Sequence, residues 1–558
     1  MLEKKIDKNN MTLEKMGSRY PSRLSFSRSM LRVMVRDNWK LKRVKFELDN
    51  DGYGSVVYQL KTPNQMYSLV CFSQYLESKD RSDRVIADKW DTAYTLHIGK
   101  LSQKNLERLK KNVPLQEAGR GSPNELVLSR ANKSVRLFNA VVESLSKGLQ
   151  PNIKEINDVG YLLRTTAVYG NGKFGMSDYL RTKNVTDFDQ PFRAEMLAVY
   201  IIREFSIDLV EHIAFCKNPS KAVKLENKIK QHLGIGNSTG LGMAPFIIKH
   251  PTLIHKWMSQ YEKVLKKIKL KKTIRKNKFV LFIKSLKKAK LYLNEVITYD
   301  KYQKNKNYNS SKEIAKIIEY CEKISSKKKI NITWKSLINY CEKNYCFDAQ
   351  EIVKVQIIEL FPTISDPFAE KMSDKENIAV KPSQKISSLL LEIKKKYKWA
   401  IKINFNDKNN NFLFWYTSEE KLEPRLGERY NEKGAELEQP LGVGKMVKEL
   451  YNFIISNSKT HNLTVAEFLL KFPHFRGIIR RIQTLSKYKY GEVNDNILSK
   501  NTIPINMLRF KLSFFGASRY DPKSDRWLRV SFFAGAPFYN YLSNKNVDSW
   551  GFATMNSY

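Results

Sequence analysis

Apolar and polar residues alternate with a period of two along several short stretches near the N-terminus, which predicts β-strands. The stretches 44–48 and 55–60 flank residues 49–54, whose Asp, Asn and Gly content is typical of a β-hairpin turn. The alternation recurs over 66–72 and 91–98. We therefore expect at least four strands in the first hundred residues.

Apolar residues spaced three and four apart predict helices in the rest of the N-terminal half. The predicted helices are 25–38, 101–111, 134–146 and 155–168. A longer, mostly apolar segment from Phe192 to Phe215 is also expected to be helical. The first 23 residues are polar and basic without a period, and we expect a mobile tail there.

The same order of features begins again near residue 386. A helix is predicted at 387–398, strands at 400–405 and 411–416, and a further helix at 445–456. Residues 422–429 then match 115–121 in position, and 477–491 match 161–175. This recurrence predicts an α+β fold with two similar halves that arose by internal duplication. The alternative is a chance recurrence of common hairpin and helix patterns.

These patterns divide the chain into four parts. The parts are a basic tail at 1–23, an α+β half at 24–255, a Lys-rich helical module with its connection at 256–385, and a second α+β half at 386–558. Within the last part, two Phe-rich strands are expected at 507–516 and 527–535, followed by a polar tail at 541–558. A ligand cleft between two such halves is a natural expectation.

Composition supports a folded, cytoplasmic protein. Of the 558 residues 42% are hydrophobic, enough to build sizeable cores. We find no apolar run near the roughly 20 residues that a membrane span needs, and the N-terminus has no secretory signal. The five cysteines are scattered, and the single pair Cys341 and Cys346 has no nearby His; neither a disulfide framework nor a metal site is expected.

The net charge of +42 has two interpretations. It can attract nucleic acid or an acidic protein partner. Alternatively, it can reflect a bias of composition toward lysine and asparagine. The distribution of arginine helps to choose between these interpretations. Only Arg275 lies between Arg203 and Arg425, whereas lysines are frequent there, so the positive charge of that region is typical of a composition bias. Arginines elsewhere are therefore the more informative positive charges, since a guanidinium binds carboxylate or phosphate through two hydrogen bonds.

Two glycine-rich segments are candidate anion sites. In the second, 234–242, main-chain N–H groups before a helix predicted from Phe246 would cradle a phosphate or carboxylate. Its candidate residues are Gly236, Asn237, Ser238, Thr239 and Gly240. The first segment, 170–175, offers Lys173. Neither is a P-loop or a dinucleotide fingerprint, and a plain turn is the alternative for both.

Four side chains on the helix predicted at 192–215 are candidate catalytic groups. They are Glu204, Asp208, Glu211 and His212. At about 100° per residue the three carboxylates fall in a narrow stripe with Arg193, and His212 lies beside it. If the stripe lines a cleft, burial can raise a carboxylate pKa for acid–base chemistry. The alternative is the solvent-facing stripe of an otherwise buried helix. No second ligand-bearing helix is evident, so we predict no metal.

Arginines of both halves complete the candidate binding set. They are Arg120 and Arg164 in the first half and Arg425 and Arg429 in the second. If the halves face each other, these guanidiniums would clamp an acidic ligand; surface ion pairs are the alternative.

Three blocks, 161–175, 234–245 and 423–429, resemble those of uncharacterised bacterial proteins of similar length, a resemblance that implies no activity. The sequence thus favours an enzyme or binding protein for a small phosphate- or carboxylate-bearing molecule. The alternatives are a nucleic-acid-binding protein that uses the Lys-rich surface and an interaction protein for an acidic partner.

Overall fold

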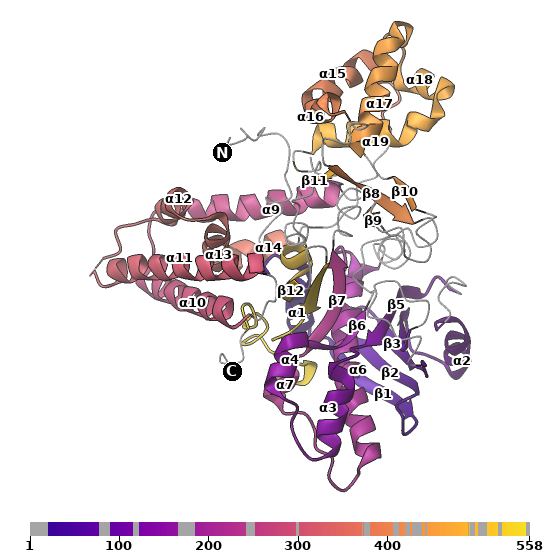
Figure 1. The fold of residues 1–558 in the computed structure, drawn as a ribbon, viewed down its shortest axis with the longest axis vertical. Helices are drawn as coiled ribbons and strands as arrows, with labels where there is room; N and C mark the ends of the chain where they lie inside the picture. The colour runs from indigo at the N-terminus through magenta and orange to yellow at the C-terminus, as the bar shows by residue number, and fades with distance from the viewer. Residues whose placement is uncertain are drawn as a thin grey trace. The chain divides into compact units, whose positions relative to one another are not determined.

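The structure is a computed structural model that describes most of the chain. The described residues are 20–77, 90–114, 122–165, 185–240, 251–296, 301–327, 329–370, 372, 380–404, 412–418, 424–426, 438–440, 443–488, 490, 497–499, 511–522 and 527–553. They form two compact units, each assembled from separate pieces of sequence (Figure 1). The sheet unit holds described residues within 18–239, 263–373 and 508–558, and the bundle unit holds those within 240–262 and 374–507.

A nine-stranded sheet forms the centre of the sheet unit, in the order β1-β2-β3-β4-β5-β6-β7-β13-β12. Neighbours from β1 to β6 are antiparallel, β6 and β7 are parallel, and β13 and β12 are antiparallel. The strands are β1 (Lys40–Leu48), β2 (Gly54–Lys61), β3 (Met66–Ser73), β4 (Thr92–Ile98), β5 (Glu125–Lys133), β6 (Tyr161–Thr165), β7 (Gly234–Gly240), β12 (Ala517–Pro522) and β13 (Trp527–Phe532). The first four confirm the N-terminal strand predictions, and the chain mixes α and β structure as expected.

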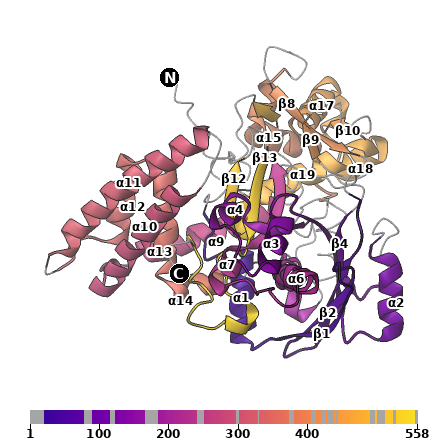
Figure 2. The ribbon, with the colours of Figure 1, turned by 60° about the horizontal axis from the view of Figure 1, so that its bottom comes forward.

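Helices cover both faces of this sheet. Ala93 of β4 lies in a buried apolar cluster with Leu106 and Leu109 of α2 (Gln103–Asn112). The next residue, Tyr94, packs its ring against Phe205 of α6 (Arg193–Lys217), with centroids 5.8 Å apart. Successive side chains of a strand point to opposite faces, so α2 and α6 lie on opposite sides of the sheet (Figure 2).

The long helix α6 is the central element of its face, and it confirms the helix predicted over 192–215. It contacts α1 (Phe26–Arg36) and α3 (Leu137–Ser146). Seventeen of its 25 residues are buried, which makes it a core helix rather than a surface helix with one apolar stripe.

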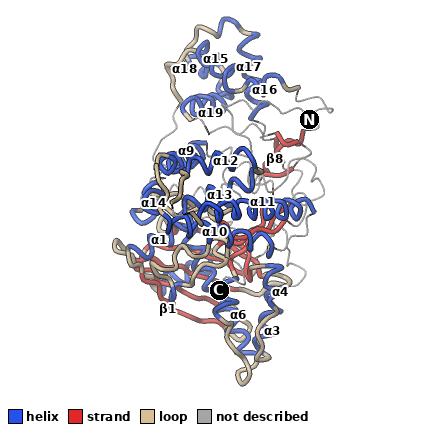
Figure 3. The backbone as a smooth tube through the Cα atoms, turned by 90° about the vertical axis from the view of Figure 1, so that its left-hand side faces the viewer, coloured by secondary structure: helices blue, strands red, loops and turns tan. Residues whose placement is uncertain are grey.

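Helices α9 to α14 follow β7 in sequence. Their bounds are α9 (Pro251–Lys269), α10 (Lys276–Glu295), α11 (Lys301–Ser325), α12 (Trp334–Asn344), α13 (Phe347–Glu359) and α14 (Pro362–Ala369). In the sheet unit, α10 packs along α11, and α13 contacts both (Figure 3). The buried Trp334 ring holds them together through edge contacts with Phe282 and Phe361.

A charge network ties the N-terminal segment to α13, α14 and the C-terminal segment. Arg28 donates two hydrogen bonds to the Glu359 carboxylate, at 2.5 and 2.8 Å, and a third to Asp548 at 3.1 Å. The network's three guanidiniums and three carboxylates belong to Arg23, Arg28, Arg32, Glu359, Asp366 and Asp548. Burial alone would raise the pKa of Asp548, but the guanidiniums lower it to about 2.

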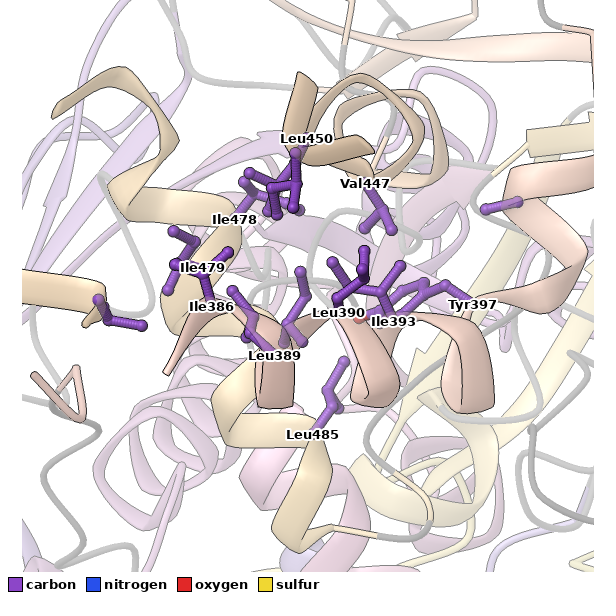
Figure 4. Packing of buried hydrophobic residues seen from close by; sticks show 14 of the residues in the cluster. Ile386, Leu389, Leu390, Ile393, Tyr397, Val447, Leu450, Ile478, Ile479 and Leu485 are labelled. Carbon is purple, nitrogen blue, oxygen red and sulfur yellow. The ribbon is translucent and has the colours of Figure 1, made fainter. Parts of the chain in front are cut away.

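The bundle unit is built around a helical core. Its helices are α15 (Ile386–Lys396), α16 (Lys398–Lys402), α17 (Val443–Ser456), α18 (Val465–Lys471) and α19 (Arg476–Lys487). Figure 4 shows their buried side chains, including Leu389, Leu450 and Ile479, directed toward one another. A small sheet joins β8 (Phe412–Ser418) with β9 (Pro424–Leu426), β10 (Glu438–Pro440) and β11 (Ile497–Ser499).

Several predicted elements are wrong. The helix expected at 155–168 ends early, because α4 (Ile153–Val159) is closed by Gly160 at φ +79° and β6 follows directly. Residues 400–402 of the strand expected at 400–405 belong to the helix α16. A π-helical turn occupies 511–515, where a strand was expected.

The predicted termini also need correction. Tyr20 is buried, and Arg23 is ion-paired with Asp366, so the packed structure begins before residue 24. At the other end, Trp550 is fully buried and Asp548 joins the charge network. Residues 541–553 are therefore part of the folded unit and not a polar tail.

Candidate functional site

The acidic stripe of α6 makes main-chain and side-chain contacts within the sheet unit. Glu204 accepts a hydrogen bond from the main-chain N–H of Tyr539 at 2.8 Å. Burial raises the pKa of this carboxyl to about 7, while the Tyr539 hydrogen bond opposes the rise. Such a pKa suits a group that exchanges protons near neutral pH.

The other three members of the stripe bind three further segments. Asp208 accepts from the Tyr58 hydroxyl at 2.6 Å and pairs with Arg43 at 2.7 Å. Glu211 accepts from Lys230 at 2.6 Å and from the Leu225 main-chain N–H at 3.0 Å. His212 Nε2 lies 2.8 Å from the Asp49 carbonyl oxygen.

These contacts dock α6 onto its surroundings. Asp208 and His212 hold the β1–β2 hairpin, Glu211 holds the segment around α7, and Glu204 holds the segment that follows β13. The structure does not bring the four groups together around one point, and their catalytic role stays a prediction.

The neighbouring Arg203 shows what a buried charge does in this helix. Its guanidinium is fully buried and donates to the carbonyl oxygens of Leu233 at 2.6 Å, Ala536 at 2.9 Å and Gln231 at 3.0 Å. It also lies 3.9 Å from the Phe538 ring centroid. Arg203 therefore satisfies carbonyls at the C-terminal end of α7 (Asn227–His232), a structural role that the sequence pattern did not reveal.

The second glycine segment is a strand, so the predicted loop before a helix is wrong from Gly234 to Gly240. A Cβ on Gly234 would stand 2.4 Å from the Phe532 carbonyl oxygen, and one on Gly236 would stand 2.5 Å from the Tyr161 ring. Close packing of neighbouring strands thus accounts for both glycines. Asn237 is buried, and its Nδ2 donates to the Thr165 carbonyl oxygen at 2.7 Å.

The remaining predicted ligand residues are dispersed. Ser238, Thr239 and Gly240 end β7, while Arg164 is buried on β6 and pairs in register with Gly236. Arg425 belongs to β9 in the bundle unit. Arg120, Lys173 and Arg429 lie outside the described residues, as does the first glycine segment, 170–175.

Within the described part of the chain, no three His, Cys, Asp or Glu side chains gather closely enough to hold a metal ion. Among the same residues, no helix combines the length and apolar character that crossing a bilayer requires.

The bundle unit contains a feature that the sequence reading missed. Helix α18 begins with a capping box between Thr464 and Glu467, and the four residues 472–475 connect it to α19. Two helices joined by a three- or four-residue turn are the framework of helix-turn-helix DNA-binding modules. Both helices bury apolar residues in one core, which they share with α15 and α17.

Helix α19 has two sharply different sides. Ile478, Ile479, Ile482 and Leu485 are buried in the bundle core, as Figure 4 shows for Ile478 and Leu485. The exposed side carries Arg476, Arg480 and Lys487, with Arg481 half-buried. The helix contains no acidic residue. At Gly477, no atom lies within 4 Å of the position of an added Cβ, so the first turn is open to close approach.

The helical segments around α19 are also basic. Residues 380–404 and 443–488 contain 15 lysines and arginines and three acidic residues. Lys394 and Lys395, exposed on α15, add to it, and α15 contacts α19. The geometry is thus that of a basic helix presented on a stable apolar core. In comparisons with known proteins, no protein-family model, no curated protein sequence and no solved structure matches this chain.

Proposed function

We propose that the protein binds duplex DNA through α19 of the bundle unit. The observation that supports this most strongly is the uniform charge of the helix's exposed side, where Arg476, Arg480 and Lys487 face solvent with no acidic residue on the helix. DNA carries one negative charge per roughly 1.7 Å of helix axis, so a row of cations matches it.

The order of the helices supports α19 as the recognition helix of this proposal. In helix-turn-helix proteins the second helix enters the major groove, and residues near its N-terminus contact base edges. Arg476 is the first residue of α19 and Arg480 lies one turn later. An arginine binds the O6 and N7 atoms of guanine through two hydrogen bonds. Gly477, between them, presents no side chain that would keep the helix from the groove.

The lysines around α19 would supply contacts to phosphate. Lys394 and Lys395 are exposed near the end of α15, and Lys396 of the same helix donates to the Leu485 carbonyl oxygen of α19 at 2.8 Å. This hydrogen bond holds the basic end of α15 against α19. Phosphate contacts fix position and orientation on the duplex, whereas contacts to bases specify sequence.

A small-anion enzyme centred on α6 has less support. The glycine segment that would cradle the anion is a sheet strand, and Asp208 and Glu211 are engaged by Arg43 and Lys230.

The proposal is tested by fluorescence anisotropy of a labelled random-sequence duplex with the full-length protein at about 50 mM salt, where non-specific affinity is highest. Arg476→Gln combined with Arg480→Gln should weaken binding by about tenfold or more, as expected for losing two arginine contacts. The control combines Lys329→Gln with Lys335→Gln, which removes the same charge from exposed positions in the sheet unit.

A threefold or smaller effect of the control, beside the tenfold loss in the α19 variant, supports the proposal. Equal losses in both variants would show that binding follows net charge and not α19. Tighter binding of single-stranded RNA than of the duplex, or retention of an acidic protein in place of DNA, would also overturn it.

A further inference from the structure

Two arginines in the first turns of α19 are free to contact a duplex. Arg476 is the first residue of the helix, Arg480 lies four residues later, and both side chains are exposed. Within the described part of the chain, neither guanidinium forms an ion pair or a hydrogen bond. Helix positions four apart differ by about 40° around the axis, so both guanidiniums lie on one side of α19.

The neutral polar side chains of α19 are used by the bundle itself. Gln483 is buried, accepts from the Lys381 main-chain N–H at 2.8 Å, and donates to the Lys381 carbonyl oxygen at 3.0 Å and to Gln384 Oε1 at 2.7 Å. The buried Thr484 donates to the carbonyl oxygen one turn earlier at 2.7 Å, and Ser486 donates to the Gln483 carbonyl oxygen at 2.8 Å.

This arrangement decides which bases α19 can recognise. Adenine is recognised through two hydrogen bonds by Asn or Gln, and the cytosine amino group is recognised by Glu or Asp. The single Gln of the helix is buried and engaged, and the helix contains no Asn, Asp or Glu. The exposed side therefore offers arginine, which recognises guanine through its O6 and N7 atoms.

The spacing of the two arginines determines which bases they would reach. Four residues advance about 6 Å along a helix axis. In the helix of a zinc finger, side chains about three positions apart contact successive bases, and in helix-turn-helix proteins the N-terminal residues of the second helix reach base edges. Arg476 and Arg480 would accordingly reach neighbouring base pairs.

We propose that α19 recognises two adjacent G·C pairs, with one guanine bound by Arg476 and the other by Arg480. Lys487 lies on the same side of the helix, eleven residues after Arg476, and as a point charge it would contact phosphate. The inference rests on the proposed function, duplex binding by α19, and adds the sequence that the helix prefers.

Competition against a labelled duplex, followed by fluorescence anisotropy with the full-length protein, tests the preference. The competitors are duplexes of about 20 base pairs, roughly two turns of DNA. One contains only A·T pairs, three contain a central GG, GC or CG step, and three contain the same two pairs half a turn apart. One of the adjacent steps should compete about tenfold or more better than the A·T duplex, and at least about threefold better than its separated counterpart.

Substitutions that keep the charge separate base recognition from attraction to phosphate. Arg476→Lys and Arg480→Lys each lose the planar fork of donors, so each should reduce the preference for the best adjacent step at least about threefold. Lys487→Gln should weaken binding of every duplex by the same factor, and the control Lys329→Gln with Lys335→Gln should keep the wild-type preference.

A preference that survives both lysine variants would overturn the inference, as would tighter binding of the A·T duplex or of the separated pairs. Equal affinity for all seven competitors would also overturn it, while DNA binding by α19 would stand. No binding to any duplex would be the failure of the proposed function itself, so the two outcomes are distinguishable.

Discussion

Arg476 and Arg480 lie four residues apart on the exposed side of α19, and no acidic residue of that helix lies between or beside them in sequence. Like charges at this spacing destabilise a helix by about 0.2–0.5 kcal/mol. Replacing both by Gln should therefore leave the free energy of unfolding unchanged or slightly higher, although it weakens DNA binding. Urea denaturation measures the first quantity. A loss above about 1 kcal/mol would indicate that the arginines stabilise the fold, since surface changes usually stay below about 0.5 kcal/mol.

Gly477 provides a test of whether duplex DNA closely approaches the first turn of α19. Its Cβ position is open, so Ala should fit and stabilise α19 by about 0.5 kcal/mol through reduced chain entropy. Gly477→Glu should also fold, because a negative charge near a helix N-terminus is favourable. The same charge would repel phosphate, and we expect Gly477→Glu to bind duplex DNA several-fold more weakly than Gly477→Gln. Equal affinities of the Glu and Gln variants would place the DNA away from this turn.

Glu204 should make stability depend on pH. Its pKa is raised from 4.5 to about 7, mainly by burial, so the folded protein binds more protons than the unfolded chain between those values. The free energy of unfolding contributed by this group must then fall as pH rises from about 4.5 to about 7. Glu204→Gln keeps an oxygen that can accept the Tyr539 hydrogen bond and removes the titration. The variant should match the wild type near pH 4.5 and exceed it by about 1–3 kcal/mol at pH 8. A stability difference that is constant with pH would contradict this.

Asp548 should be the most sensitive carboxylate of the charge network. It contacts Arg23, Arg28 and Arg32, and its pKa is lowered from 3.8 to about 2. Its contribution to stability is present above pH 3.8 and is lost as pH falls through about 2. Asp548→Asn should cost about 3–5 kcal/mol at pH 7, because it leaves buried guanidiniums undercompensated.

Asp366→Asn is the matched comparison. The Asp366 side chain is 28% exposed and that of Asp548 is 18% exposed, so the Asp366 substitution should lower the free energy of unfolding by less. Unfolding of both variants in guanidinium chloride measures which substitution lowers the free energy of unfolding more. A larger loss for Asp366→Asn would show that the network is organised around α14 and not around the C-terminal segment.

The local pattern of apolar and polar residues was sufficient to predict the elements whose partners are close in sequence. Each of the strands β1 to β4 pairs with the strand that precedes or follows it in sequence. Their period-two alternation of apolar and polar residues is visible in the sequence itself. In contrast, β7 pairs with β6, some seventy residues earlier, and with β13, far later in the chain. The glycines of β7 show no alternation of apolar and polar residues. The close contacts with Phe532 and Tyr161 that require glycine are evident only from the fold. The duplication stays a prediction, and α16 replaces one of the strands on which it was based.

The candidate sites show the same contrast between features that are local in sequence and contacts between distant segments. The apolar helix allowed a raised carboxylate pKa in the stripe but did not indicate that Glu204 would have it. The partners that hold Asp208 and Glu211 come from distant segments. For α19 the signals were local: the Thr464 to Glu467 capping box, the Ile478 to Leu485 apolar spacing and the run of arginines.

The most direct test is the salt dependence of DNA affinity for the wild type and the Arg476→Gln, Arg480→Gln variant. The logarithm of the association constant should fall linearly with the logarithm of salt concentration, with a slope of about −0.9 for each phosphate neutralised. If α19 lies against the duplex, the double substitution should make the slope shallower by about one to two, and the Lys329→Gln, Lys335→Gln control should keep the wild-type slope. Identical slopes for the wild type and the α19 variant, or no measurable binding at low salt, would contradict duplex recognition by this helix.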